Sequence, residues 1–451
     1  MNAAAEEFRE TRLQAVRGAL ESGAVRNVQR MLHSLHPAEL GRLLESLPPA
    51  ERTIVWQLVD PDAKGDVLLE VNDEVRSGLI DNMEPEALVA ATGDMEVDDL
   101  ADVFEDLPEA VITQILRAMD VQDRERLESV LAYPEDSAGG LMNTDTVTVR
   151  PDVSLDVVQR YLRLRGNLPD RTDILFVVNR YGQYLGSLGL SALLVSDPQA
   201  TVAELMDTSV EGIVANVSAS EVARRFEERD LVSAPVTDED NRLLGRITVD
   251  DVVDVIREEA EHSLMSMAGL DEDEDMFAPV VTSARRRALW LGVNLATAFV
   301  AAGVVGLFEA TIDKVVALAV LMPVVASMGG IAGGQTLTLM IRGLALGQVE
   351  KSNARFMMGK EIAVGILNGI FWALVVAAVV MLWFGNWQIG AVIALAITIN
   401  MFVAAISGVA IPLLLRRLGV DPALAGNVIL TTVTDVVGFF AFLGLGALLL
   451  I

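Results

Sequence analysis

The C-terminal part of the chain is dominated by apolar runs, and hydrophobic patterning gives the first division of the sequence. Each run is at or above the roughly 20 residues that a helix needs to span the hydrocarbon core of a bilayer. The runs cover residues 288–308, 315–341, 361–384, 389–415 and 423–451. The pattern therefore predicts a transmembrane domain of five helices over residues 285–451.

Upstream of the spans, apolar residues recur at helical spacing in short segments that end at prolines. Two examples are HPAELGRLLESLPPAER (36–52) and VDDLADVFEDLPEAVITQILRAM (97–119). Leu47-Pro48 and Leu107-Pro108 each close one helix before the next begins, because proline interrupts the helical hydrogen-bond ladder. We expect residues 1–135 to form an α-helical repeat domain.

A second repeat, over residues 136–250, combines helices with strands. LMNTDTVTVRPDVSLDVV (141–158) matches LMDTSVEGIVANVSASEVA (205–223), and each copy continues into a strand, a turn and a second strand. These units resemble a tandem pair of CBS domains. The resemblance implies ATP or another adenosyl nucleotide at Thr248 and Asp251 in GRITVDD (245–251), whereas GSLGLSAL in the first unit lacks such an Asp. A dimerising and sensing module without ligand is the alternative.

A long helix is predicted to lead from this module towards the membrane. It begins with DVVDVIREEAEHSLMSMAGL (251–270), inside a connecting segment that covers residues 251–284. A helix that joins a sensing domain to a membrane domain is suited to gating, because movement of one domain shifts the other.

Charge separates the two halves of the chain. Residues 1–284 hold 57 of the 63 acidic residues and 24 of the 34 basic ones. Such a surface repels nucleic acid and attracts cations, although a solvated surface or adaptation to high salt would give the same count. The absence of cysteine excludes disulfides and thiolate metal sites.

Basic residues between the spans predict the orientation in the membrane. Those on one side are Arg285, Arg286, Arg287, Arg342, Lys351, Arg355, Lys360, Arg416 and Arg417. The other side carries only Lys314. The positive-inside rule places the N-terminal domains in the cytoplasm and Ile451 outside a cell membrane that the chain crosses several times.

One acid, Asp435, stands inside the last apolar run. On a helix it shares a face with Asn427, Thr431, Thr434 and Gly438. No Lys or Arg occurs within the five spans, and an unpaired acid at mid-depth costs at least about 2.5–3.5 kcal/mol. Either protonation or a hydrated cation would offset that cost.

The surrounding residue types favour the cation. A proton relay usually uses several ionisable groups, and the spans offer only Glu361 besides Asp435. Four glycines and Pro323 in the second span are compatible with close helix packing through small residues. Together with the polar strip of the last span, they favour an opened backbone at MGGIAGGQ (328–335), whose carbonyls would line a pore. The expected pore ligands are all oxygen atoms, and oxygen ligands alone suit hard ions such as Mg²⁺. They belong to Asp435, Asn427, Thr431 and Thr434. Since one carboxylate is a weak site for a divalent ion, we infer a homodimer that brings two copies of Asp435 together.

Three motifs identify a resemblance that covers nearly the whole chain. They are YPEDSAGGLM (133–142), MGGIAGGQTLTLMIRGLA (328–345) and LGVDPALAGNVILTTVTDVVGFF (418–440). With this domain order, the chain resembles the MgtE family of prokaryotic Mg²⁺ channels. The resemblance implies a homodimer with its pore on the two-fold axis, an ion bound at Asp435, and closure by cytoplasmic Mg²⁺. The sensor acids that it implies are Asp98, Asp102, Asp251, Asp254 and Glu259.

The sequence departs from the family pattern at two places. Ile331 stands where the family has Asn, and His262 and Ser263 replace an acidic pair in the connecting helix. Mg²⁺ is the expected substrate, with Co²⁺ or another divalent ion as an alternative. A coupled cation exchanger and a membrane-anchored ion or nucleotide sensor without transport are the other hypotheses. No nucleophile and base set, P-loop or catalytic metal motif indicates an enzyme.

Overall fold

A computed structural model describes residues 25–93, 95–104, 106–270, 274–349 and 352–451, together with residues 16, 18 and 19. Lys351, used above to predict orientation, lies outside these residues. The chain forms two compact units, Met1–Ala260 with Asp273–Pro279, and Glu261–Glu272 with Val280–Ile451.

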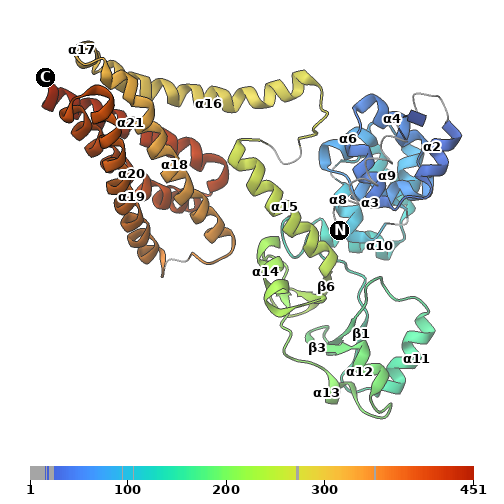
Figure 1. Ribbon diagram of the computed structural model, residues 1–451. Coiled ribbons are helices and arrows are strands. Elements are labelled where there is room, and N and C mark those ends of the chain that lie inside the picture. Colours follow the sequence, from blue (N-terminus) through green and yellow to red (C-terminus); the bar gives the residue numbers. More distant parts are fainter. Residues whose placement is uncertain are drawn as a thin grey trace. The chain divides into compact units, whose positions relative to one another are not determined.

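The first unit begins with a stack of short helices (Figure 1). The helices are α2 (Val25–Leu32), α3 (Pro37–Glu45), α4 (Pro49–Leu58), α5 (Lys64–Leu69), α6 (Asp73–Ile80), α7 (Pro85–Thr92), α8 (Val97–Phe104), α9 (Glu109–Ala118) and α10 (Val121–Val130). Pro48 and Pro108 occupy the N-caps of α4 and α9, so each Leu-Pro pair does separate two helices. Leu44, Trp56 and Leu68 are fully buried in their shared core.

Two three-stranded sheets with the same topology follow in the first unit. The strands are β1 (Thr148–Val149), β2 (Ile174–Val178), β3 (Tyr184–Gly189), β4 (Ile213–Val214), β5 (Ser233–Thr237) and β6 (Leu243–Thr248), and the helices are α11 (Leu155–Arg165), α12 (Leu190–Val195), α13 (Val202–Leu205) and α14 (Ala219–Arg229). In each sheet the first strand is parallel to the second, and the third is antiparallel to the second. The paired topology confirms the tandem CBS repeat.

One helix, α15 (Val249–Ala268), begins directly after β6, as predicted for the connecting segment. Five further helices are long and apolar enough to cross a membrane. They are α16 (Val280–Gly306), α18 (Ala317–Ala345), α19 (Ala354–Phe384), α20 (Trp387–Leu418) and α21 (Pro422–Leu450), with the short α17 (Glu309–Lys314) after α16. The fold is therefore mainly α-helical.

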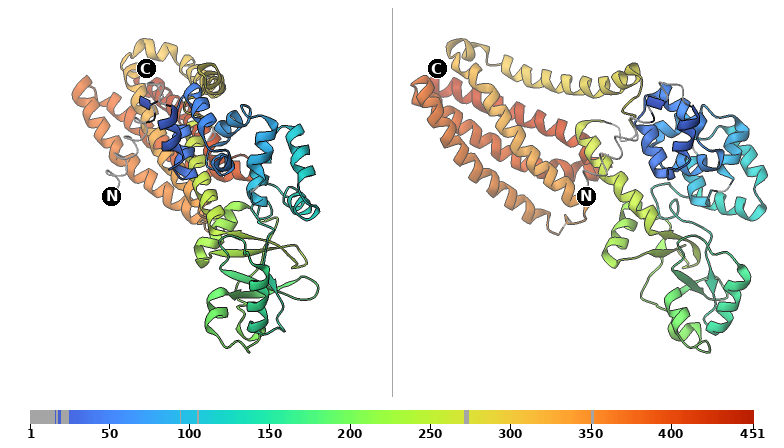
Figure 2. Two further views of the ribbon diagram at one scale, coloured as in Figure 1. Left: turned by 90° about the vertical axis from the view of Figure 1, so that its right-hand side faces the viewer. Right: turned by 45° about the vertical axis from the view of Figure 1, so that its right-hand side comes forward.

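The transmembrane helices pack around α20. This helix contacts α18, α19 and α21 and is the most enclosed of the five. In contrast, α16 diverges from the others, is largely exposed and makes its main contacts with α21 (Figure 2).

The expectation of an opened backbone in the second span is wrong. Helix α18 runs unbroken through Pro323 and the glycines. Instead, the glycines let neighbouring helices approach: a Cβ added at Gly329 would lie 2.1 Å from Asn400 Nδ2, and one at Gly333 would lie 2.9 Å from Leu430 Cδ1. Small residues serve this role in membrane helices, so the helix can stay intact.

Candidate functional site

The polar strip of α21 divides between two faces of the helix. Asn427 is exposed and Thr431 and Asp435 are half-buried, at i, i+4 and i+8. Thr434 is fully buried, and its hydroxyl donates to the carbonyls of Leu430 and Thr431, each at 3.1 Å. The strip predicted from the sequence spreads over about 100° of the helix, so packing encloses one edge and leaves the other accessible.

Asp435 has no partner among the described residues, since no base or hydrogen-bond donor there engages its carboxylate. Glu361, the other acid named within the spans, is buried, accepts a hydrogen bond from Thr336 Oγ1 at 3.1 Å and lies 3.4 Å from Lys360 Nζ. Asp435 is thus the accessible acid that a cation could approach.

Asn400, which the sequence analysis did not single out, lies in the packed centre of the spans. Its side chain is fully buried between Gly329 of α18 and Gly438 of α21, and Nδ2 donates to the carbonyl of Val325 at 2.9 Å. The Oδ1 atom has no partner. An Asn in a long apolar run was the signal that could have identified it.

The first unit brings several predicted sensor acids together where α8 packs on the second CBS sheet. Val97 and Ala101 of α8 contact the apolar core of that sheet. Asn143 Nδ2 donates to Glu96 Oε2 at 2.6 Å and to Asp98 Oδ1 at 3.2 Å. Asp98 is only 9% exposed, so its carboxylate is held away from bulk water.

Burial and mutual repulsion make these carboxyls resist ionisation. Burial, then the charges of Asp251, Asp99 and Glu96, raises the pKa of Asp98 to about 8. Burial and the charges of Glu96 and Asp251 raise the pKa of Asp99 to about 7, and burial and Asp250 raise the pKa of Asp251 to about 6. A cation placed here would remove the electrostatic penalty that these shifts express.

The remaining predicted sensor acids are more open to solvent. Asp102 is exposed at its surface, yet desolvation, then the charges of Glu135 and Asp99, raises its pKa to about 7. Asp254 and Glu259 are exposed on α15, and Asp254 Oδ1 lies 3.4 Å from Arg257 Nη1. Throughout the described ranges, no three His, Asp or Glu side chains converge as a preformed metal site.

The predicted nucleotide residues adjoin one another at the start of α15. Thr248 donates to Asp251 Oδ2 from both its backbone N–H and its hydroxyl, each at 3.1 Å, and its hydroxyl lies 2.5 Å from Asp250 Oδ1. Arg171 Nη1 contacts Asp250 Oδ2 at 2.5 Å. Asp251, in the first turn of α15, therefore holds the residue before the helix, and its charge also acts on Asp98 of α8.

Comparisons with known proteins agree with this architecture. Family models match at residues 322–445 (divalent cation transporter), 35–136 (MgtE intracellular N domain) and 202–258 (CBS domain). A magnesium transporter MgtE of Thermus thermophilus is 31% identical over 96% of this chain and 97% of its own length. The chain belongs to the MgtE family.

Two further similarities cover the MgtE architecture in whole or in part. A magnesium transporter MgtE of Bacillus subtilis is 28% identical over 94% of each chain. A solved structure described as the cytosolic domain of the Mg²⁺ channel MgtE in complex with ATP is 31% identical and covers 54% of this chain and 99% of that one, with a TM-score of 0.49.

Both departures from the MgtE pattern lie in the second unit. Ile331 is 60% exposed on α18. His262 Nε2 lies 3.4 Å from Asp421 Oδ2, and Asp421 caps α21 by accepting hydrogen bonds from the N–H groups of Ala423 and Leu424. In place of an acidic pair, this chain therefore has a histidine next to the first turn of the helix that carries Asp435.

Proposed function

We propose that this chain forms a homodimeric channel for Mg²⁺ whose pore follows the two-fold axis, with one Asp435 from each copy on the ion's path. The observation that carries the proposal is the accessible, unpartnered carboxylate of Asp435 within an apolar helix of the described chain. Two such carboxylates around a largely hydrated ion match the coordination that Mg²⁺ prefers. Thr431 and the exposed Asn427 extend the polar face along α21. Co²⁺ and other divalent ions could share this route.

A proton route has less support. Glu361 is buried and engaged by Thr336 of α18 and by Lys360 of its own helix, so it is not free to relay a proton to Asp435. A relay would need a second ionisable group near Asp435, and the described spans supply none within hydrogen-bonding reach.

The orientation in the membrane follows from the basic loops, which favour cytoplasmic N-terminal domains and an external C-terminus.

Cytoplasmic Mg²⁺ is proposed to close the pore by binding among the acids shared by the helical repeat, the CBS pair and the connecting helix. Asp98, Asp102 and Asp251 lie where these elements meet, and Asp254 and Glu259 continue along α15. When Mg²⁺ is scarce, ionised carboxylates repel one another; when it is plentiful, the ion bridges them and stabilises the closed packing. Without a preformed cage, the site would bind Mg²⁺ weakly and with retained waters.

An adenosyl nucleotide is a further ligand that we propose for the second CBS unit. Thr248 and Asp251 stand together at the end of β6, where a hydroxyl and a carboxylate could hold the two hydroxyls of a ribose. Bound there, the nucleotide would supply phosphate charge close to the sensor acids and so change their affinity for Mg²⁺.

Uptake by a Mg²⁺-transport-deficient strain tests the pore. Asp435→Ala and Asp435→Asn should each lower uptake at least about ten-fold, because the ion loses its charged ligand in a low-dielectric region. Asp313→Ala, which removes an exposed acid from α17, is the matched control and should transport normally. Normal uptake by a folded Asp435→Ala dimer would refute the pore assignment, whereas a failure of the wild type itself to restore uptake would favour a sensor without transport.

Flux into liposomes separates a channel from a coupled exchanger. A channel needs only a Mg²⁺ gradient with charge compensation, whereas an exchanger stops when the counter-ion or pH gradient is removed. Loss of flux after collapse of the pH gradient would therefore contradict the channel.

A further inference from the structure

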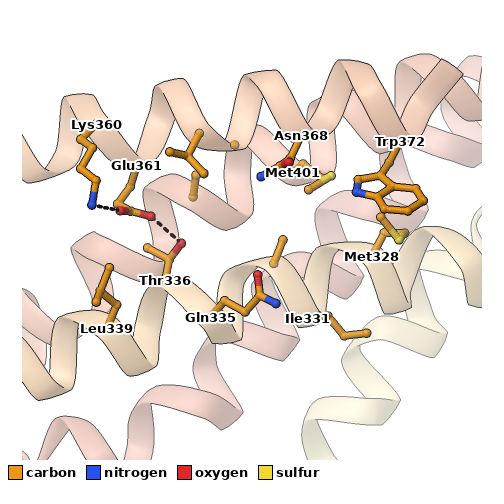
Figure 3. Close-up of a pocket in the computed structure, with 14 residues that line it drawn as sticks. Met328, Ile331, Gln335, Thr336, Leu339, Lys360, Glu361, Asn368, Trp372 and Met401 are labelled. Carbon is orange, nitrogen blue, oxygen red and sulfur yellow. Dashed lines mark hydrogen bonds and ion pairs between the residues drawn. The ribbon is translucent and has the colours of Figure 1, made fainter. Parts of the chain in front are cut away.

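A cavity of about 570 Å³ lies between α18, α19 and α20, and no residue of α21 lines it. Figure 3 shows Lys360 and Glu361 at one end and Trp372 and Met328 at the other. Its volume is in the range of pockets that bind organic ligands. The proposed ion route along α21 makes no use of it.

The polar end of the cavity is built around a buried acid. Glu361 is 6% exposed, and its two oxygens face Thr336 Oγ1 at 3.1 Å and Lys360 Nζ at 3.4 Å. The Lys360 side chain is half exposed. A lysine ammonium has three N–H donors, so Glu361 can fix its position while donors remain for a ligand in the cavity. The cavity therefore presents an anchored cation at its mouth.

The cavity also has the length of one membrane leaflet. The helical rise puts Asn368 about 12 Å, and Trp372 about 18 Å, along α19 from Lys360. Half of a hydrocarbon core is about 15 Å thick. Lys360 and the exposed Arg355 lie at the basic end of the spans, where headgroups would be, so Trp372 lies deep among the acyl chains.

Two amides in the middle of the cavity require a polar partner. Gln335 of α18 and Asn368 of α19 lie on opposite walls and are both exposed (Figure 3). Amide N–H groups at membrane depth are costly when they face hydrocarbon alone. The ester carbonyls of a lipid are acceptors that belong at this depth.

We propose that this cavity binds one glycerophospholipid, with its phosphate on Lys360, its ester carbonyls on the amides of Gln335 and Asn368, and one acyl chain along Trp372 and Met328. The cavity extends over about 18 Å along α19, from Lys360 to Trp372. Such an elongated space suits an extended hydrocarbon chain.

The bound lipid would support α18. Helices α18 and α19 make few direct contacts, and both pack mainly on α20. The Thr336–Glu361 hydrogen bond is the described side-chain link across this gap. A lipid that fills the remaining space would hold α18 against α21, the helix that carries Asp435.

Native mass spectrometry of the delipidated full-length protein tests the site, with phosphatidylglycerol as the probe. Wild type should retain one lipid per chain, and Lys360→Ala should lower its occupancy about ten-fold, because a charge-assisted contact to phosphate is lost. Lys360→Arg should restore retention. Arg355→Ala, which removes a neighbouring exposed base outside the cavity, should change it less than about two-fold.

A second pair of variants tests the acyl slot. Val364→Trp places a large side chain inside the cavity, whereas Leu367→Trp places it on a face of α19 that is 70% exposed and outside the cavity. Only the first should abolish retention. If Val364→Trp does not fold, the Lys360→Ala and Lys360→Arg pair still decides.

Three results would overturn the proposal. Equal retention by wild type and Lys360→Ala would indicate an unspecific lipid shell. Diacylglycerol or glycerol phosphate, retained as strongly as phosphatidylglycerol, would show that phosphate and acyl chain are not recognised together. A disulfide between two Val364→Cys chains would put a second copy in the cavity. Retention does not require transport, so these outcomes are independent of the pore assignment.

Discussion

Neutralising Asp98 tests whether the acids between α8 and the second CBS sheet form a cation sensor. In Asp98→Asn, the amide keeps the size of the side chain and can still pair with Asn143, but the negative charge facing Asp99 and Asp251 is lost. The wild-type packing without Mg²⁺ includes a carboxyl that resists ionisation. The variant packing has one such carboxyl fewer, because Asp99, Asp102 and Asp251 remain.

The size of the effect follows from the pKa. Burial and neighbouring acids raise the pKa of Asp98 from 3.8 to about 8. A carboxyl whose pKa is raised by packing destabilises the packed state when ionised, so the cost is largest above pH 8 and disappears as the pH falls towards 4. At pH 7, keeping the Asp98 carboxyl protonated in the packed state costs roughly 4 kcal/mol of the free energy of packing. Asp98→Asn should remove most of this cost and, with it, much of the gain from binding Mg²⁺.

Hydrogen exchange of the full-length protein, followed over α8 (Val97–Phe104), measures the effect. In wild type, protection of α8 should rise on adding Mg²⁺ and on lowering the pH from 8 to 6. Asp98→Asn should be better protected than wild type without Mg²⁺ and should gain less from either change, with the remaining response due to Asp99, Asp102 and Asp251. Asp66→Asn, at an exposed acid on α5, is the control and should behave as wild type. If Asp98→Asn keeps the full Mg²⁺ response, the sensor hypothesis for this cluster is wrong.

Three other perturbations test separate parts of the molecule. Removing residues 1–250 should leave a pore whose flux no longer falls with internal Mg²⁺; unchanged inhibition in a flux assay would refute the sensor role. Arg52→Ala should expose the segment around Asp275 to protease, because it breaks a bidentate ion pair with distances of 2.7 and 3.0 Å. Both side chains of the pair are under 10% exposed, so the free energy of unfolding should fall by about 3–5 kcal/mol. Equal cleavage rates would contradict this. Gly329→Ala should lower the free energy of unfolding of the spans by about 1–3 kcal/mol, since its Cβ would overlap Asn400. An unchanged melting temperature would show that the helices separate easily.

Long-period patterns made the domain order accessible from sequence. A bilayer demands about 20 apolar residues per helix, so each predicted span falls largely within one observed helix. Proline likewise marks helix starts in the N-terminal repeat, because Pro48 and Pro108 remove donors that a helix interior would need. Each of these signals lies within one continuous segment of the chain, so a single sequence is enough to identify it.

Contacts between distant segments were not accessible in this way. Arg52 and Asp275 are 223 residues apart, and nothing in either neighbourhood marks them as a buried pair. The helical period grouped Thr434 with Asp435, yet packing against the other spans buries Thr434 and leaves Asp435 half-accessible. Periodicity gives the angle between two side chains, whereas burial depends on which helices pack beside them.

The two groups of acids would hold the same ion by different means. At Asp435 one carboxylate per chain lies in apolar surroundings, so each carboxylate attracts the ion strongly. Few ligands therefore suffice, and few ligands also let the ion leave the site during permeation. Around Asp98 several carboxylates crowd at the edge of a folded domain, and their repulsion weakens the packing until a cation arrives. Because that repulsion falls when the carboxyls are protonated, acid should imitate Mg²⁺ at the sensor. Acid should oppose Mg²⁺ at the pore, where protonation removes the ligand. Current measured at fixed internal Mg²⁺ with cytoplasmic pH varied from 8 to 6 should therefore fall in the full-length protein more steeply than in the protein lacking residues 1–250, and equal slopes would place all the pH dependence in the pore.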